Sequence, residues 1–202
     1  MKLYYSPGAC SLSPHIALLE AGLKFDLVLA STKTKKLADG SDFMLINPKG
    51  SVPVLELDNG ERLTEGPAIV QYIADQAPAK QLAPANGSMA RYRLQEWLNF
   101  ITSELHKGFS PLFNPATTEE YKPQVRAKLA ERFAWVNEQL EGKQYLMGEQ
   151  FSVADAYLFV VSNWGQYVGV DVAGYPNLVA FRARVAARPA VIAAMTAEGL
   201  LK

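Results

Sequence analysis

The chain has 202 residues, and 49% of them are hydrophobic, which is enough for one large or two small domains with conventional cores. The chain has 20 Lys and Arg residues and 20 Asp and Glu residues, so its formal net charge is zero. Without an excess of positive charge, we expect no nucleic-acid partner. No apolar run approaches the ~20 residues of a membrane span, and the N-terminus passes too soon into Ser6-Pro7-Gly8 to supply a signal-peptide core. We therefore expect a cytoplasmic protein with no membrane partner.

The only cysteine, Cys10, lies between an apolar strand start and a helical pattern. A lone cysteine cannot form an intrachain disulfide. Pro14 suits the first turn of a helix, which places Cys10 just ahead of a helix N-terminus, where a thiol pKa falls below its usual value of about 8.5. A buried, inert thiol is the commoner fate of a free cysteine. With Ser11 and Ser13 beside it, the pattern favours a reactive thiol.

A proline inside a strand pattern, Pro53, belongs at a strand start, a bulge or a cis turn. If the Val52-Pro53 bond is cis, the N–H and C=O of Val52 point outward, where an extended peptide can pair with them. The following hairpin returns to Glu65 and Gly66 at the start of a helix, so a carboxylate and an N–H can together hold an ammonium and a carboxylate. The motif predicts a small, extended ligand that is zwitterionic at one end, although ordinary α/β domains also contain such hairpins.

Short β-type runs alternate with helical ones from Lys2 to about Tyr72, and a Pro-rich linker follows. Beyond the linker only helices are expected. Three of them are predicted at 89–107, where Gly108 to Pro111 should break the helix, at 121–141 and at 177–187.

The second half of the chain has two spacings of polar residues that predict roles for their side chains. Asn99, Ser103 and His106 are spaced by four and three residues, so they form one polar stripe, which could also simply face water. Ser152 and Asp155 have the spacing of a capping box, which predicts a structural role for both.

Seven motifs spread over the chain are informative together: Pro7-Gly8-Ala9-Cys10-Ser11, Asn47-Pro48-Lys49-Gly50, Val52-Pro53, Thr64-Glu65-Gly66, Glu96-Trp97-Leu98-Asn99, Glu104 to Gly108 and Ala154 to Phe159. Through them the whole chain resembles the bacterial beta class of cytosolic glutathione S-transferases. The resemblance implies an α/β thioredoxin-like N-terminal domain over residues 1–80, a linker over 81–86 and an all-α C-terminal domain over 87–202. It also implies a homodimer with glutathione as co-substrate and no permanently bound cofactor or metal.

The resemblance further implies the roles of individual residues. Cys10 would face the glutathione sulfur and can form a mixed disulfide with it, and Tyr5 is not assigned an activating role. The catalytic candidates are Cys10, Ser11 and His106. Glutathione would contact Cys10, Lys35, Val52, Glu65, Gly66, Asn99, Ser103, Glu104, Leu105 and His106, in part from the second subunit. Lys35 lies in a short basic run that would otherwise be read as a solvated face.

A hydrophobic electrophile is the expected second substrate. Its pocket is predicted from Tyr5, Phe109, Leu112, Phe113 and Trp164, for which core packing is the alternative role. Pro53, Ser152 and Asp155 are expected to be structural. The predicted function is conjugation of glutathione to hydrophobic electrophiles in detoxification, accompanied by thiol–disulfide exchange at Cys10. A non-catalytic binding or adaptor protein on the same fold, and a glutaredoxin-like reductase, remain as alternatives.

Overall fold

The computed structural model describes residues 1–201, and these residues form two compact units. The first unit comprises Met1–Ala83 together with the segment from Arg188 onward. The second unit comprises Pro84–Ala187. Each unit has its own buried core, so each is described by itself.

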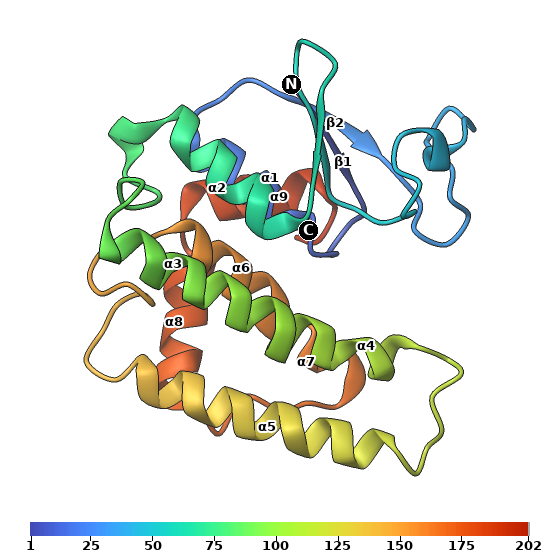
Figure 1. The fold of residues 1–202 in the computed structure, drawn as a ribbon. Coiled ribbons are helices and arrows are strands. Elements are labelled where there is room, and N and C mark those ends of the chain that lie inside the picture. Colours follow the sequence, from blue (N-terminus) through green and yellow to red (C-terminus); the bar gives the residue numbers. More distant parts are fainter. Residues whose placement is uncertain (202) are drawn as a thin grey trace. The chain divides into compact units, whose positions relative to one another are not determined.

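The first unit is built on a four-stranded sheet in the order β2-β1-β3-β4 (Figure 1). The strands are β1 (Lys2–Tyr5), β2 (Asp26–Leu29), β3 (Val54–Glu56) and β4 (Arg62–Thr64). β1 is parallel to β2, and the β1–β3 and β3–β4 pairs are antiparallel. Leu3, Val54 and Leu55 are fully buried, which explains why these short apolar runs form the centre of the sheet.

The helices of the first unit pack on α1 (Leu12–Ala21). Both α2 (Gly66–Gln76) and α9 (Pro189–Ala197) contact it, and the 3₁₀ turns η1 (Phe43–Leu45) and η2 (Pro78–Lys80) lie in the connections. The sequence predicts that the second domain runs to the end of the chain, whereas α9 groups with the first unit. The physical reason is its contact with α1, supported by an ion pair in which Arg188 reaches both carboxylate oxygens of Glu20 at 2.6 and 2.9 Å.

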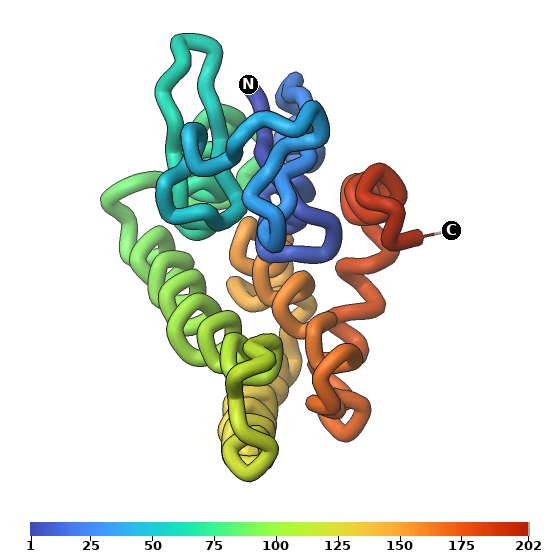
Figure 2. Tube along the Cα trace, turned by 90° about the vertical axis from the view of Figure 1, so that its right-hand side faces the viewer, coloured from blue at the N-terminus to red at the C-terminus, as the bar shows by residue number. Residues whose placement is uncertain are grey.

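The described second unit has no β-strand: it contains helices, turns and an isolated bridge between Tyr145 and Gly148. Its helical elements are α3 (Met89–Phe100), the π-helical turn η3 (Ile101–His106), α4 (Lys107–Phe113), α5 (Lys122–Gln139), α6 (Val153–Asn163), α7 (Gly165–Val168) and α8 (Pro176–Ala186). In Figure 2 the tube follows one helical path from α3 through η3 into α4. The predicted combination of a thioredoxin-like α/β part with a helical part is confirmed.

The prediction that Gly108 to Pro111 breaks the helix after His106 is wrong. The helix continues as α4 to Phe113, and the Asn114 N–H closes it on the carbonyls of Ser110 and Pro111. Gly108 serves packing instead, because a Cβ at this position would lie 2.9 Å from Leu129 Cδ2 of α5. Pro111 removes only one helical hydrogen bond, which the surrounding helix tolerates.

The predicted capping box is present at the start of α6. Asp155 is fully buried, and its two carboxylate oxygens accept the Leu146 N–H at 2.8 Å and the Ser152 N–H at 2.7 Å. Burial raises the pKa of Asp155 to about 6, against the effect of these donors. The contact with Leu146 joins the helix to the preceding loop, as expected for a structural residue.

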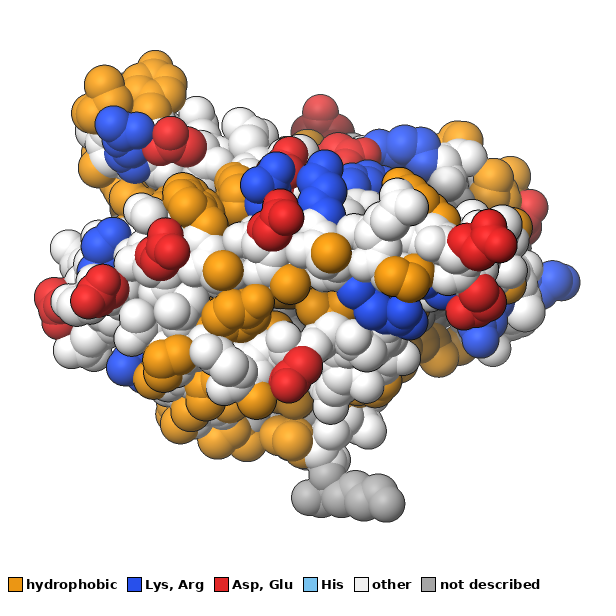
Figure 3. Space-filling model, turned by 90° about the horizontal axis from the view of Figure 1, so that it is seen from below, with side chains coloured by type: hydrophobic (Ala, Val, Ile, Leu, Met, Phe, Trp, Pro, Cys, Tyr) orange, Lys and Arg blue, Asp and Glu red, His pale blue; other side chains and the backbone are white. Residues whose placement is uncertain are grey.

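Charged side chains of both signs are interspersed over the face drawn in Figure 3, in keeping with the zero net charge. Within residues 1–201, no helix combines the length and apolar character needed to cross a membrane.

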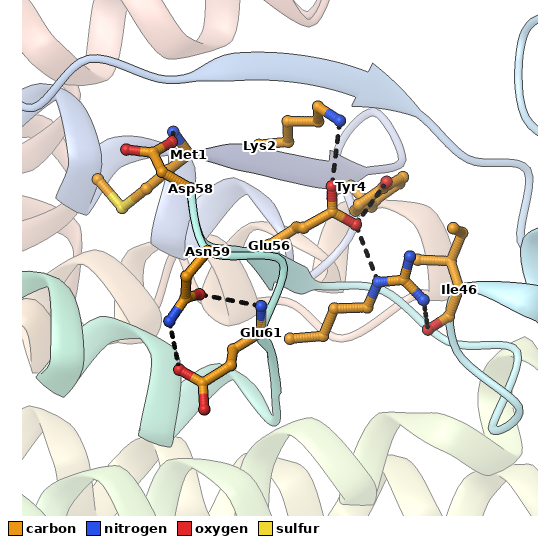
Figure 4. A network of polar contacts seen from close by, with 9 residues as sticks. Met1, Lys2, Tyr4, Ile46, Glu56, Asp58, Asn59 and Glu61 are labelled. Carbon is orange, nitrogen blue, oxygen red and sulfur yellow. Dashed lines mark hydrogen bonds and ion pairs between the residues drawn. The ribbon is translucent and has the colours of Figure 1, made fainter.

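Glu56 is the centre of a polar network on the first unit's sheet (Figure 4). Its Oε2 accepts from Arg62 Nε at 2.9 Å and from the Tyr4 hydroxyl at 3.2 Å, and its Oε1 accepts from Lys2 Nζ at 3.0 Å. Arg62 also donates to the carbonyls of Leu45 and Ile46. Arg62 makes the largest contribution to lowering the pKa of Glu56, and Lys2 and Tyr4 add to it against burial. Glu56 thus joins β1, β3 and β4, and its partner Arg62 extends the network to the end of η1 and to Ile46.

We expect Glu56→Gln to destabilise the protein by about 1 kcal/mol at pH 7, because charge-assisted hydrogen bonds are lost. The folded-state pKa is below the usual 4.5, so this stabilisation is present above pH 4.5 and is lost as the pH falls through the folded-state value. The melting temperatures of the wild type and of Glu56→Gln should therefore differ more at pH 7 than at pH 3. Glu61→Gln, which changes an exposed carboxylate in the same hairpin, is the control; an equal gap at both pH values would contradict the assignment.

Candidate functional site

A turn over residues 47–51 precedes the Val52-Pro53 edge, and a buried side chain closes it. Asn47 is 3% exposed, its Nδ2 donates to the Ser51 carbonyl at 2.7 Å, and its Oδ1 accepts the Lys49 N–H at 3.1 Å. Gly50 occupies the left-handed region with φ 62°, where a side chain would be strained. The Val52-Pro53 bond is cis. The turn thereby fixes the backbone that leads into Val52.

Cys10 lies directly against this edge. Its thiol donates to the Val52 carbonyl at 3.3 Å, which joins two of the predicted site residues. Ser11 is fully buried, and its hydroxyl accepts the Ser6 N–H at 3.1 Å and donates to the Ser6 carbonyl at 3.2 Å. Ser11 therefore closes the loop that presents Cys10 ahead of α1.

A second anchor of the Cys10 loop has no signal in the sequence. Glu198, which follows α9, accepts the Gly8 N–H on Oε2 at 2.9 Å, and its Oε1 lies 2.9 Å from His15 Nδ1. His15 and Glu198 are both buried, which favours a structural role for His15. Since 190 residues separate Gly8 from Glu198, no local pattern could have revealed the contact.

Tyr5 ends β1 and is half-buried, with its ring centroid 6.3 Å from that of His15. Burial raises the pKa of the Tyr5 phenol, and the Glu198 carboxylate raises it further. A raised pKa keeps the phenol protonated, so the Tyr5 hydroxyl remains a hydrogen-bond donor and does not act as a base.

Glu65 forms the N-cap of α2 with φ 69°. This left-handed conformation is costly for a residue with a side chain, and such residues cluster at ligand sites. Lys49 Nζ contacts Glu65 Oε1 at 2.5 Å and Thr64 Oγ1 at 2.8 Å. Glu65 and Gly66 thus stand where α2 begins, and the Gly66 N–H belongs to the first turn of that helix.

Lys35 also has a left-handed backbone, with φ 57°, and its Nζ donates to the Gly50 carbonyl at 2.7 Å. The short basic run therefore does not simply face solvent at this position, because Lys35 is half-buried against the turn. The segment 47–53 accordingly contacts Cys10, Lys35 and Glu65. Lys49 was missed, since the sequence offers only its place in the Asn-Pro-Lys-Gly motif.

The remaining glutathione candidates lie in the second unit, around η3. Asn99 and Ser103 are exposed and share a hydrogen bond, in which the Ser103 hydroxyl donates to the Asn99 carbonyl at 3.1 Å. Glu104 pairs with Arg132 of α5 at 2.8 Å. Leu105 is fully buried, so only its backbone is available to a ligand. The π turn, which sequence spacing did not predict, includes a bond from the Lys107 N–H to the Thr102 carbonyl; such turns are frequent at functional sites.

His106 lies at the end of η3 and is oriented by aromatic neighbours. Its Nδ1 is 2.6 Å from the hydroxyl of Tyr157, which is almost completely buried in α6. Its ring centroid is 4.8 Å from that of Trp164, in an edge-to-face arrangement. Tyr157 belongs to the Ala154 to Phe159 motif, but its contact with His106 could not be read from the sequence.

The aromatic residues among the predicted electrophile-pocket residues of the second unit form one cluster. Phe109, Phe113 and Trp164 have centroids between 5.8 and 6.3 Å apart. Phe109 is fully buried, which favours the packing role that the sequence left open for it, and Leu112 and Trp164 are each 9% exposed. Phe113 is 50% exposed and can meet a ligand directly.

Within the described chain, no group of three or more His, Cys, Asp or Glu side chains is arranged to hold a metal ion.

Two segments of the chain match domains of one protein family. Residues 1–75 match the glutathione S-transferase N-terminal domain, and residues 100–189 match the glutathione S-transferase C-terminal domain. The chain is 50% identical to the glutathione S-transferase GstA of Escherichia coli O157:H7, over 99% of this chain and all of that protein. The chain belongs to the glutathione S-transferase family. The predicted enzyme class, a glutathione transferase, is confirmed with it.

Solved structures of this family superpose closely on the chain. A sphingomonad glutathione S-transferase complexed with glutathione has a TM-score of 0.96 and 52% identity, covering all of both chains. A bacterial beta-class glutathione S-transferase of Sphingomonas chungbukensis also has a TM-score of 0.96, with 50% identity over both full chains. The predicted resemblance to the bacterial beta class is confirmed.

We expect Tyr157→Phe to lower the turnover of glutathione about fivefold, because the variant loses the hydroxyl that orients His106, a hydrogen bond of about 1 kcal/mol. His106→Ala should lower turnover further. In both variants the pH profile of kcat should change, whereas the melting temperature should change little. Tyr167→Phe, at an exposed tyrosine of the same unit, is the control. If turnover fell only in proportion to a fall in melting temperature, His106 and Tyr157 would have a structural role instead.

Proposed function

We propose that this glutathione transferase binds the tripeptide along the 47–53 segment and joins its thiol to hydrophobic electrophiles. The observation that carries the proposal is the contact of Cys10 Sγ with the Val52 carbonyl, the backbone edge to which the resemblance assigns the cysteinyl moiety. Glu65 and Gly66 receive the γ-glutamyl end, and Lys35 receives the glycyl carboxylate. Asn99, Ser103, Glu104 and His106 contribute to the same ligand, as the family resemblance implies.

Conjugation requires a glutathione thiolate held beside an electrophilic carbon. The thiolate forms the C–S bond, the leaving group departs with its electron pair, and the thiol proton passes to solvent. Positioning supplies much of the rate, because a bimolecular step becomes effectively unimolecular. Apolar walls such as Phe113 discriminate between electrophiles by only about 1–3 kcal/mol per methylene, so a broad hydrophobic substrate range follows.

Cys10 gives the same site a second chemistry. Its thiolate can attack the glutathione sulfur of a mixed disulfide, forming a Cys10–glutathione disulfide and releasing the other thiol. A second glutathione thiolate then attacks that disulfide, which releases oxidised glutathione and restores Cys10. Ser13 stands where a C-x-x-C site would have its resolving cysteine, so external glutathione must perform this last step.

The test is the initial rate of conjugation to chlorodinitrobenzene and of reduction of a glutathione mixed disulfide, for the wild type and Cys10→Ala. We expect both wild-type rates to exceed background. Cys10→Ala should abolish the mixed-disulfide rate and the glutathione adduct seen by intact mass, because no other cysteine exists. An adduct that survives would refute the role of Cys10. Glutathione binding without either rate would favour the adaptor alternative, and reduction alone would favour the glutaredoxin-like reductase.

We further propose that the enzyme is a homodimer of the cytoplasm, with each site completed by the partner subunit. Twofold dimers are the commonest oligomers, and a thiol that must stay reduced suits the cytoplasm. Light scattering should give twice the 22.2 kDa chain mass. A single-chain mass at the concentrations used for turnover would remove the proposal of a dimer.

A further inference from the structure

Lys49 contacts Glu65 but is not among the predicted site residues, although it lies in the Asn47-Pro48-Lys49-Gly50 motif. We propose that Lys49 is a specificity-determining residue for the γ-glutamyl end of glutathione, positioning the Glu65 carboxylate and supplying the positive charge that the ligand's α-carboxylate needs beside it. This inference rests on the proposed function, since it concerns the same ligand.

Lys49 is held at both of its ends. Its backbone N–H donates to the side chain of buried Asn47 at 3.1 Å, and its Nζ donates to Thr64 Oγ1 at 2.8 Å and Glu65 Oε1 at 2.5 Å. The ammonium therefore spans from the 47–51 turn to the end of β4 and the N-cap of α2. These contacts place it at the helix N-terminus that the ligand is expected to occupy.

The contact with Lys49 restricts the Glu65 side chain, which is 69% exposed. Rotamer freedom that is already lost in the free protein does not have to be lost when the ligand binds. A carboxylate has about four acceptor positions on its two oxygens, so a contact with Lys49 does not prevent it from accepting a ligand ammonium as well. Lys49 thereby orders Glu65 before binding and can stay in place afterwards.

The balance of charge also requires Lys49. The γ-glutamyl end carries one ammonium and one carboxylate, so with Glu65 alone the site would hold two negative charges and one positive charge. Repulsion between the Glu65 carboxylate and the α-carboxylate of the ligand would weaken binding or favour protonation of one of them. The N-terminus of α2 offers only a partial positive charge, equivalent to about half an elementary charge. With Lys49 the four charges sum to zero.

Lys35 does not substitute for Lys49. Its Nζ is anchored on the Gly50 carbonyl, whereas Lys49 points to Thr64 and Glu65. The 47–51 turn therefore has two lysine ammonium groups near it, those of Lys35 and Lys49, and glutathione has two carboxylates that they can pair with. We assign Lys49 to the γ-glutamyl carboxylate and leave Lys35 with the glycyl one.

The test compares the wild type, Lys49→Met and Lys49→Arg in chlorodinitrobenzene conjugation over a range of glutathione concentrations. Lys49→Met should raise KM for glutathione about three- to tenfold, the equivalent of one exposed charge-assisted hydrogen bond, and should change kcat less than about twofold. Lys49→Arg should restore most of the KM. Lys24→Met, which removes an exposed lysine of the same unit, is the matched control.

A glutathione analogue without the α-carboxylate, γ-aminobutyryl-cysteinyl-glycine, separates charge recognition from general damage. With this analogue the KM ratio of Lys49→Met to wild type should shrink toward that of the control variant. An unchanged or lowered KM with glutathione, or the same ratio for both peptides, would overturn the assignment. If Lys49→Met loses its cooperative melting transition, Lys49→Gln takes its place in the comparison.

The wild type distinguishes the two levels of the proposal. A wild-type rate that does not saturate with glutathione would contradict the proposed function itself. A saturable wild-type rate with no effect of Lys49→Met would contradict the role of Lys49 alone.

Discussion

The closure of the 47–51 turn by the buried Asn47 side chain is the interaction on which the candidate site of the first unit depends. One amide satisfies the Ser51 carbonyl and the Lys49 N–H, which fixes the backbone that leads into Val52. Lys35, Cys10 and Glu65, from three separate parts of the chain, then each contact this segment. Because buried amides lose free energy when they are left without partners, this arrangement is specified much more tightly than an ordinary surface loop.

The reactive thiol depends on a second set of buried contacts. Ser11 closes its own loop, and Glu198 ties that loop to the segment after α9 and to His15. The C-terminal helix therefore supports the presentation of Cys10, although it follows the whole helical unit in the sequence. In the second unit a comparable constraint acts on His106, whose imidazole is held by the Tyr157 hydroxyl and the Trp164 ring.

Two irregular backbone features coincide with candidate site residues. Glu65 and Lys35 adopt left-handed conformations without being glycine, and both are expected to contact the ligand. The π turn over Ile101–His106 widens the helix at the polar positions Ser103 and His106. Such departures from regular geometry persist only where the surrounding contacts determine them, here the 47–51 turn and the packing around η3.

Local pattern in the sequence determined the family, the two-part fold, the hairpin, the capping box and the place of Cys10 ahead of a helix. Those features depend on neighbouring residues or on a motif that stays together in the chain. The tertiary structure alone decided that α9 joins the first unit, that Gly108 permits packing instead of ending a helix, and that Lys49, Tyr157 and Glu198 contact candidate site residues. Each of these depends on side chains brought together from distant positions, and spacing along the chain carries no information about such contacts.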